Sequence, residues 1–112
     1  MGEEKLRDIF FWVGASGTQY KYYVANTDRL VGIAGNFIWV DAAGEPVYIG
    51  EFGNLRQAFE PAVAQPAKAA GATALHLHNN LSGREARLKE QQDLIARWTP
   101  VCNLAEPDGS PS

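Results

Sequence analysis

The chain has 112 residues, enough for one domain built around one hydrophobic core. With 46% hydrophobic and 21% charged residues, its composition is that of an ordinary globular protein. The formal charge of -3 excludes a global positive field, so nucleic-acid binding would need a local basic patch. The single cysteine, Cys102, excludes an intrachain disulfide and a multi-cysteine metal site.

The N-terminal stretch MGEEKLRDIFFWVG places acidic residues before a short apolar run, which is unlike a secretory signal. No apolar stretch in the sequence approaches the roughly 20 residues needed to span a bilayer. A chain with a single cysteine suits a reducing compartment. We therefore expect a soluble cytoplasmic protein with no membrane partner.

Two aromatic and β-branched runs open the chain, at residues 9–13 (IFFWV) and 19–25 (QYKYYVA). The intervening GASGT is a turn signal, so the pattern predicts a β-hairpin. The residues that follow, NTDRL, are expected to form a loop. We assign residues 1–34 to an N-terminal hairpin extension that packs on the same domain as the rest.

A second hairpin is predicted from FIWV (37–40) and PVYIG (46–50), which flank the turn sequence DAAGE. Asn54 is a good N-cap for a helix over LRQAFE, and Pro61 should end or kink that helix. The alanine-rich residues 62–72 then predict a second short helix closed by Gly71.

The alternating TALHLH (73–78) predicts a third strand of the main sheet. Ser82 and Glu85 fit a capping box for a helix that reaches about Trp98. The acidic, Pro/Gly/Ser-rich tail over 104–112 predicts disorder. The expected fold class is α+β, with a small antiparallel sheet of three central strands flanked by helices, plus the N-terminal hairpin.

Residues 35–103 resemble the GIY-YIG nuclease domain. Gly35-Asn36-Phe37 stands at the first triplet and Tyr48-Ile49-Gly50 at the second, with ten residues between them (38–47). Asn54-Leu55 is similar to the start of the family's first helix. Leu94-Ile95, Pro100 and Asn103 resemble its C-terminal pattern. These landmarks occur in the family's order, which implies the family's fold.

The resemblance implies a mechanism with one divalent metal ion held by a glutamate on the last helix. An arginine on the first helix contacts the scissile phosphate, and tyrosines of the two triplets help to activate water. A hard cation prefers charged oxygen ligands, and developing phosphate charge needs a fixed cation.

Most of these groups are replaced in this chain. The position of the family's glutamate is Gln91, that of the arginine is Ala58, and that of the first tyrosine is Phe37. Only Tyr48 retains a family side chain. No cofactor is therefore expected, and Mg²⁺ or Mn²⁺ would be needed only if cleavage is retained.

Helix geometry at 100° per residue predicts an inward stripe on the last helix, with Gln91 near its centre (Leu88, Gln91, Leu94, Ile95, Trp98). Glu90, about 100° from Gln91, is expected to face solvent. On the first helix, Arg56 lies about 160° from Ala58 and is also expected to point outward. Neither charged residue is therefore expected to replace the lost one.

Other polar residues could contact nucleic acid in the cleft implied by the resemblance: Arg56, His76, His78, Arg84 and Arg87. His76 and His78 alternate along one strand, so they should share a face. No third ligand lies near them in the sequence, and we predict no metal site there.

The hairpin aromatics, interleaved with Lys21, fit either base stacking or cross-strand packing, and packing is favoured. Three functions stay open. The first is a degenerate GIY-YIG-like module that binds nucleic acid without cleaving it. The second is a scaffold on the same fold that binds a protein or a second copy of itself. The third is an active metal-dependent endonuclease with displaced catalytic residues.

Overall fold

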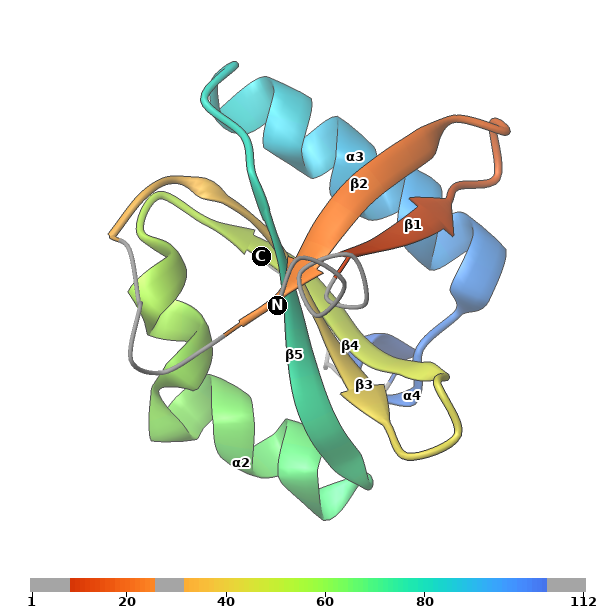
Figure 1. Cartoon of the computed structure of the whole chain (residues 1–112), viewed down its shortest axis with the longest axis vertical. Helices are drawn as coiled ribbons and strands as arrows, with labels where there is room; N and C mark the ends of the chain where they lie inside the picture. The colour runs from red at the N-terminus through yellow and green to blue at the C-terminus, as the bar shows by residue number, and fades with distance from the viewer. Residues whose placement is uncertain (1–8, 26–31, 105–112) are drawn as a thin grey trace, which may run out of the picture.

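The structure, a computed structural model, describes residues 9–25 and 32–104. In these residues five antiparallel strands form one sheet in the order β1-β2-β5-β3-β4 (Figure 1). The strands are β1 (Ile9–Val13), β2 (Gln19–Val24), β3 (Gly35–Asp41), β4 (Pro46–Phe52) and β5 (Ala72–Asn79). The helices are η2 (Leu55–Phe59), α2 (Pro61–Ala69), α3 (Arg84–Trp98) and α4 (Val101–Leu104). The predicted α+β class with an antiparallel sheet is confirmed.

Both predicted hairpins form, and β5 lies between them in the centre of the sheet. The first hairpin joins the sheet through β2, where Tyr23 pairs with Leu77 and Val24 with His76. The N-terminal strands therefore continue the main sheet. The predicted NTDRL loop (26–30) and nearly all of the predicted tail lie outside the described residues.

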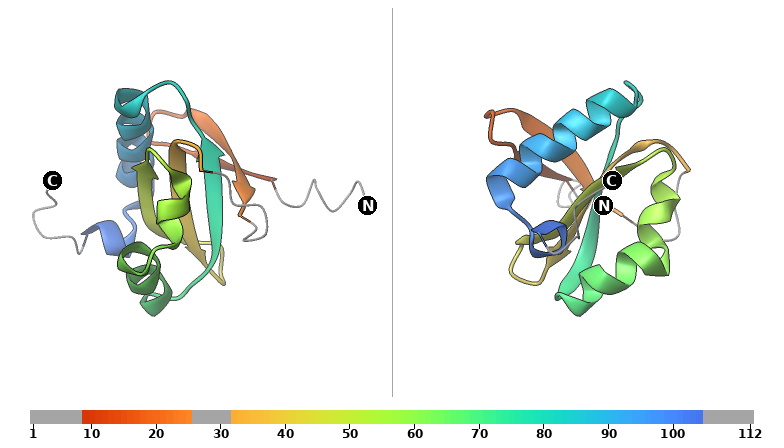
Figure 2. Two further views of the ribbon diagram at one scale, coloured as in Figure 1. Left: turned by 90° about the vertical axis from the view of Figure 1, so that its left-hand side faces the viewer. Right: turned by 180° about the vertical axis from the view of Figure 1, so that it is seen from behind.

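Helices cover both faces of the sheet, with α2 and α3 on opposite sides of the strands (Figures 1 and 2). On the η2–α2 face, alternate residues of β3 and β5 pack against small side chains of the helices. This core contains Phe37, Trp39, Leu75 and Leu77 from the sheet, with Leu55, Ala58, Ala64 and Ala67 from η2 and α2. The alanines let the helix backbone lie close to the bulky strand residues.

On the α3 face, the core is made by Ile38, Val40 and Ile49 of the central strands together with Trp12 and Tyr22 of the hairpin. Leu94 is the fully buried residue that α3 contributes to it. Because the hairpin supplies two of the largest side chains in this core, most of its aromatic content serves packing, as the sequence favoured.

The glycines of the two triplets are required by close approach. A Cβ on Gly35 would lie 2.3 Å from the backbone oxygen of His78, which a strand cannot easily move. A Cβ on Gly50 would lie 2.5 Å from the ring of Phe37, its partner on β3. Both positions therefore have a packing reason to be glycine, whether or not catalysis takes place nearby.

The helix ends differ in part from expectation. Asn54 caps its helix as predicted, with its side chain accepting from the backbone N–H of Arg56 at 3.0 Å. The segment over 55–59 is a 3₁₀ helix, because Pro61 begins α2 directly after it. The predicted capping box at Ser82 is wrong. Gly83 is the N-cap of α3, its φ is +108°, and no side chain caps the helix.

At Ile49, the outer edge of β4 is occupied by the side chain of Asn103 in α4. Its side-chain oxygen accepts from the backbone N–H of Ile49 at 2.7 Å, and its amide nitrogen donates to the Ile49 carbonyl at 2.8 Å. The amide thereby reproduces the pairing of a neighbouring strand. In the part of the chain that the structure describes, no helix has the length and apolar character needed to cross a membrane.

Candidate functional site

The positions implied by the resemblance are divided between the two faces of the sheet. Phe37 and Tyr48 lie on the η2–α2 face, where their rings meet edge to face at 5.6 Å between centroids. Ala58 is fully buried in the same core and extends no polar group. Gln91 belongs to α3, which packs against the other face.

The prediction that Glu90 faces solvent is wrong. The buried line of α3 is Arg87, Glu90 and Leu94, and Glu90 is only 3% exposed. Gln91 is half-buried beside this line, one turn after Arg87. The expected stripe was centred on Gln91, and its members Leu94, Ile95 and Trp98 do pack on this face, but Arg87 and Glu90 take the inward positions of the first half of α3.

Glu90 is held by side chains from two strands. The Tyr22 hydroxyl donates to one carboxylate oxygen at 2.6 Å, and the His78 Nδ1 atom lies 2.8 Å from the same oxygen. The amide of Asn80 donates to the other oxygen at 3.2 Å and also reaches the side-chain oxygen of Asn36. Burial, and next the charge of Glu90, raises the pKa of Tyr22 well above its ordinary value. Tyr22 therefore remains a hydrogen-bond donor.

A second charged contact lies one turn earlier on α3. The Arg87 Nε atom donates to Glu51 of β4 at 2.9 Å, and both side chains are 10% exposed. Arg84 approaches the other oxygen of Glu51 at 3.4 Å but is 72% exposed. The charge of Glu51 is thus neutralised mainly by Arg87, and the Arg84 guanidinium remains open to other partners.

The residues present do not fit the divalent ion that the resemblance implies. Gln91 offers a neutral amide, and both oxygens of the inward carboxylate, Glu90, already accept hydrogen bonds. Within 9–25 and 32–104, no three His, Cys, Asp or Glu side chains converge as a ligand set. No metal-assisted step is therefore derived for this site.

His78 is oriented by Glu90, but the residues that contact it offer no second reactive group. Its Nδ1 atom faces Glu90, and its side chain is 29% exposed, so the rest of the ring is open to a ligand atom. An imidazole oriented by a carboxylate can exchange a proton or bind a phosphate oxygen. The residues that contact it, Tyr22 and Glu90, supply no nucleophile that faces solvent.

His76 shares the face of His78, as predicted from their alternation, but has a different environment. It is 4% exposed, and its Nδ1 atom accepts from the indole N–H of Trp12 at 3.0 Å. Burial lowers the pKa of His76 to about 4. His76 is therefore neutral at physiological pH and adds no positive charge to this face.

The five predicted nucleic-acid contacts are thus separated into two groups. Arg56 and Arg84 are exposed, and His78 is partly exposed. His76 and Arg87 are buried in internal contacts. The three accessible residues lie toward the end of the sheet where β4 and β5 finish and where η2 and α3 begin.

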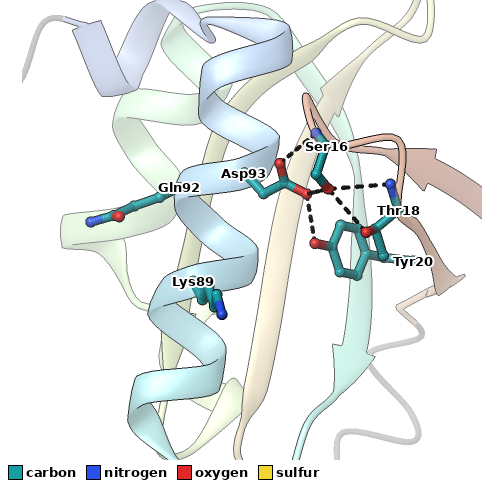
Figure 3. A pocket seen from close by; sticks show the side chains of 6 residues that line it. All are labelled: Ser16, Thr18, Tyr20, Lys89, Gln92 and Asp93. Carbon is teal, nitrogen blue, oxygen red and sulfur yellow. Dashed lines mark hydrogen bonds between the residues drawn. The ribbon is translucent and has the colours of Figure 1, made fainter.

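A separate polar cluster fastens the first hairpin to α3 (Figure 3). Asp93 accepts from the backbone N–H and hydroxyl of Ser16 and from the hydroxyl of Tyr20, at 2.7–2.8 Å. These hydrogen bonds lower the pKa of Asp93, while burial and then Asp93 raise the pKa of Tyr20 to about 12. The depression beside them, of about 610 Å³, has Lys89 and Gln92 on its rim. Since the Asp93 oxygens are already occupied, the cluster is structural.

Sequence reasoning missed Tyr22, Glu51, Glu90 and Asn80 as members of one polar network. One signal was present, because Arg87, Glu90 and Leu94 follow the i, i+3, i+7 spacing of a helix face. Their partners lie 10 to 68 residues away in the chain, and no local pattern connects them.

The chain matches no family model, no curated protein and no solved structure.

Proposed function

We propose that this protein is a GIY-YIG-like module that binds nucleic acid without cleaving it. The observation that carries the proposal is the pair of exposed guanidinium groups, Arg56 and Arg84, at one end of the sheet. Arg84 lies beside Glu51 of β4, and Arg56 follows Glu51 by five residues, a span of at most about 18 Å. Exposed guanidinium groups at one end of the sheet can contact phosphates along one nucleic-acid strand.

The chemistry of the lost family positions supports the absence of cleavage. Gln91 cannot neutralise a cation, and Ala58 cannot reach a phosphate from inside the core. Phe37 lacks the hydroxyl that the resemblance assigns to its position. Tyr48 alone supplies neither a metal ligand set nor a phosphate clamp.

Binding to labelled single-stranded and duplex oligonucleotides should therefore weaken steeply between about 50 and 200 mM salt. In the double variant Arg56→Ala/Arg84→Ala, the slope of log K against log salt should fall by about 1.4 on single strands and about 1.8 on duplex DNA. When a phosphate contact is lost, the counterions on that phosphate stay bound, so fewer counterions are released on binding.

Arg97→Ala is the matched control for charge. Arg97 stacks on Trp98 at the other end of α3, about 20 Å from Arg84, so its removal should leave the slope unchanged. Undetectable binding at low salt, or equal slopes for the double variant and the control, would refute nucleic-acid binding at this end of the sheet. Nicking of supercoiled plasmid that depends on Mg²⁺ or Mn²⁺ would refute the loss of cleavage.

A second candidate function is protein interaction through β1. It is favoured by the difference between the two edge strands of the sheet, β1 and β4. Among the described residues β1 has only β2 as a strand neighbour, and it exposes Phe10 and Phe11 at 42% and 60%. On the opposite edge, the backbone groups of Ile49 in β4 are already bonded to Asn103. An open apolar edge strand can pair with a strand of another chain, and a second copy of this chain is the simplest partner.

This candidate predicts a mass that rises with protein concentration in light scattering after size exclusion. Phe11→Lys should restore a monomer, because a charged side chain on an edge strand opposes pairing. Leu81→Lys is the control, since Leu81 is 77% exposed and lies outside the strands, after the end of β5. A monomer at every concentration, or a dimer that survives Phe11→Lys, would exclude self-association through this edge.

A further inference from the structure

A small cavity lies between the first hairpin and the β3–β4 turn, at the end of the sheet opposite Arg56 and Arg84. Its volume is about 220 Å³. Its lining includes Phe10 and Trp12 of β1, His76 of β5, and Asp41 and Gly44 at the β3–β4 turn. This volume is below the about 300–1,000 Å³ typical of sites for drug-sized ligands, so it suits one ring system.

The tautomer of His76 follows from its contact with Trp12. An indole nitrogen can only donate, so the Nδ1 atom that receives it must be unprotonated. The single proton of the neutral ring therefore sits on Nε2. His76 makes no other hydrogen bond among the described residues, yet no buried side-chain nitrogen or oxygen there lacks a partner. Nε2 must therefore reach solvent, and the cavity is where His76 meets it.

The side chain of Asp41 supplies the complementary group. One carboxylate oxygen accepts from the backbone N–H groups of Ala43 and Glu45, both at 2.9 Å, which fixes the side chain in the turn. The second oxygen has no hydrogen bond among the described residues. The residues that line the cavity thus include one N–H donor, on His76, and one acceptor oxygen held in place by the turn, on Asp41.

The remaining walls favour a flat ligand. Phe10 stacks on His76 with ring centroids 4.5 Å apart and an interplanar angle of 20°, and Trp12 is tilted against the same imidazole. Val40 and Ala74 add apolar surface. Aromatic walls with one donor and one acceptor match a ring that carries a carbonyl beside a ring N–H.

We propose that this cavity binds a pyrimidine-sized ring with a lactam edge, of which uracil is the simplest natural example. The His76 Nε2–H group donates to the ring carbonyl, and the free Asp41 oxygen accepts the ring N–H. The site is independent of the phosphate contacts proposed for Arg56 and Arg84. The same base chemistry could come from a free nucleoside or from an unpaired base in a strand.

The first test is a two-dimensional NMR titration of the whole chain with uridine and, separately, with cytidine. Uridine should shift the Trp12 indole and His76 signals in a saturable manner. Cytidine has no ring N–H at the corresponding position, so it should bind about tenfold more weakly or worse. Absent or non-saturable shifts with uridine, or equal affinities for the two nucleosides, would overturn the proposal.

The variant Asp41→Asn makes the test specific. An asparagine keeps the oxygen that holds the turn and replaces the free acceptor with a donor, so the preference should change from uridine to cytidine. Glu45→Gln is the matched control, because it makes the same change in the same turn but does not line the cavity. An unchanged preference in Asp41→Asn, with a native amide spectrum, would refute the role of Asp41.

The two sources of the base are separated by comparing uridine with short oligouridine. An affinity that rises with oligomer length identifies an unpaired base in a strand as the ligand, whereas equal affinities identify the free nucleoside. Asp41→Asn should leave the salt slope of nucleic-acid binding unchanged, and Arg56→Ala/Arg84→Ala should leave uridine binding unchanged. Failure of one site is therefore distinguishable from failure of the other.

Discussion

Replacing Glu90 with alanine is expected to lower the free energy of unfolding by about 2–4 kcal/mol. The change removes a carboxylate that accepts from Tyr22, His78 and Asn80 beneath α3. Tyr22 is fully buried, so its hydroxyl would lose its partner without gaining water. An orphaned buried donor costs about 1–3 kcal/mol, and hydrogen bonds to charged groups add a similar amount. Urea unfolding at constant m-value measures the difference.

Two further variants serve as controls for Glu90→Ala. Glu90→Gln keeps the shape and one acceptor oxygen, so it should lose about half as much stability as the alanine variant. Glu85→Ala, at an exposed position in the first turn of the same helix, should cost at most about 1 kcal/mol, the loss of one charge near the helix N-terminus. If Glu90→Ala proved as stable as Glu85→Ala, then Glu90 would face solvent and the polar network would not exist.

Acidification is expected to destabilise the protein through His76. Burial lowers the pKa of His76 to about 4, whereas an unfolded chain has a histidine pKa near 6.5. Above about pH 6.5 the ring is neutral in both states, and its contribution to stability is complete. As the pH falls from 6.5 toward 4, only the unfolded chain binds the proton, so stability decreases by about 1.4 kcal/mol per pH unit. The total loss is about 3 kcal/mol.

The measurement is the free energy of unfolding against pH for the wild type and for His76→Gln. Glutamine retains an acceptor for the Trp12 indole but does not titrate, so the difference between the two curves isolates His76 from the carboxylates. The wild-type curve should be steeper between about pH 6.5 and 4, and parallel curves would contradict the burial of a neutral ring. An NMR titration of the His76 ring should show its midpoint near pH 4.

Local signals in the sequence sufficed for most of the secondary structure. The aromatic runs around GASGT and the YIG strand after DAAGE form the two expected hairpins, because turn residues and alternation act within a few positions. The position of the first hairpin in the sheet could not be predicted from the sequence. Its pairing with β5 joins Val24 to His76, and only tertiary packing selects that partner.

The direction of the α3 side chains shows where sequence reasoning fails. Hydrophobic periodicity placed Gln91 at the centre of the inward stripe, but Arg87 and Glu90 occupy it. Their burial depends on partners supplied by Glu51, Tyr22 and His78. A charged residue can be buried when its charge is compensated, and that compensation is visible only in three dimensions.

The amide of Asn103 has a consequence for how large any assembly of this protein can grow. Strand-to-strand stacking needs two free edges per molecule to continue indefinitely, and here the β4 edge is already occupied. In two copies joined through β1, the strands at both extremes would be β4, each with its Ile49 backbone groups already bonded to Asn103. A third chain would have to displace that amide to pair in register with β4, so growth beyond two chains is opposed at this edge.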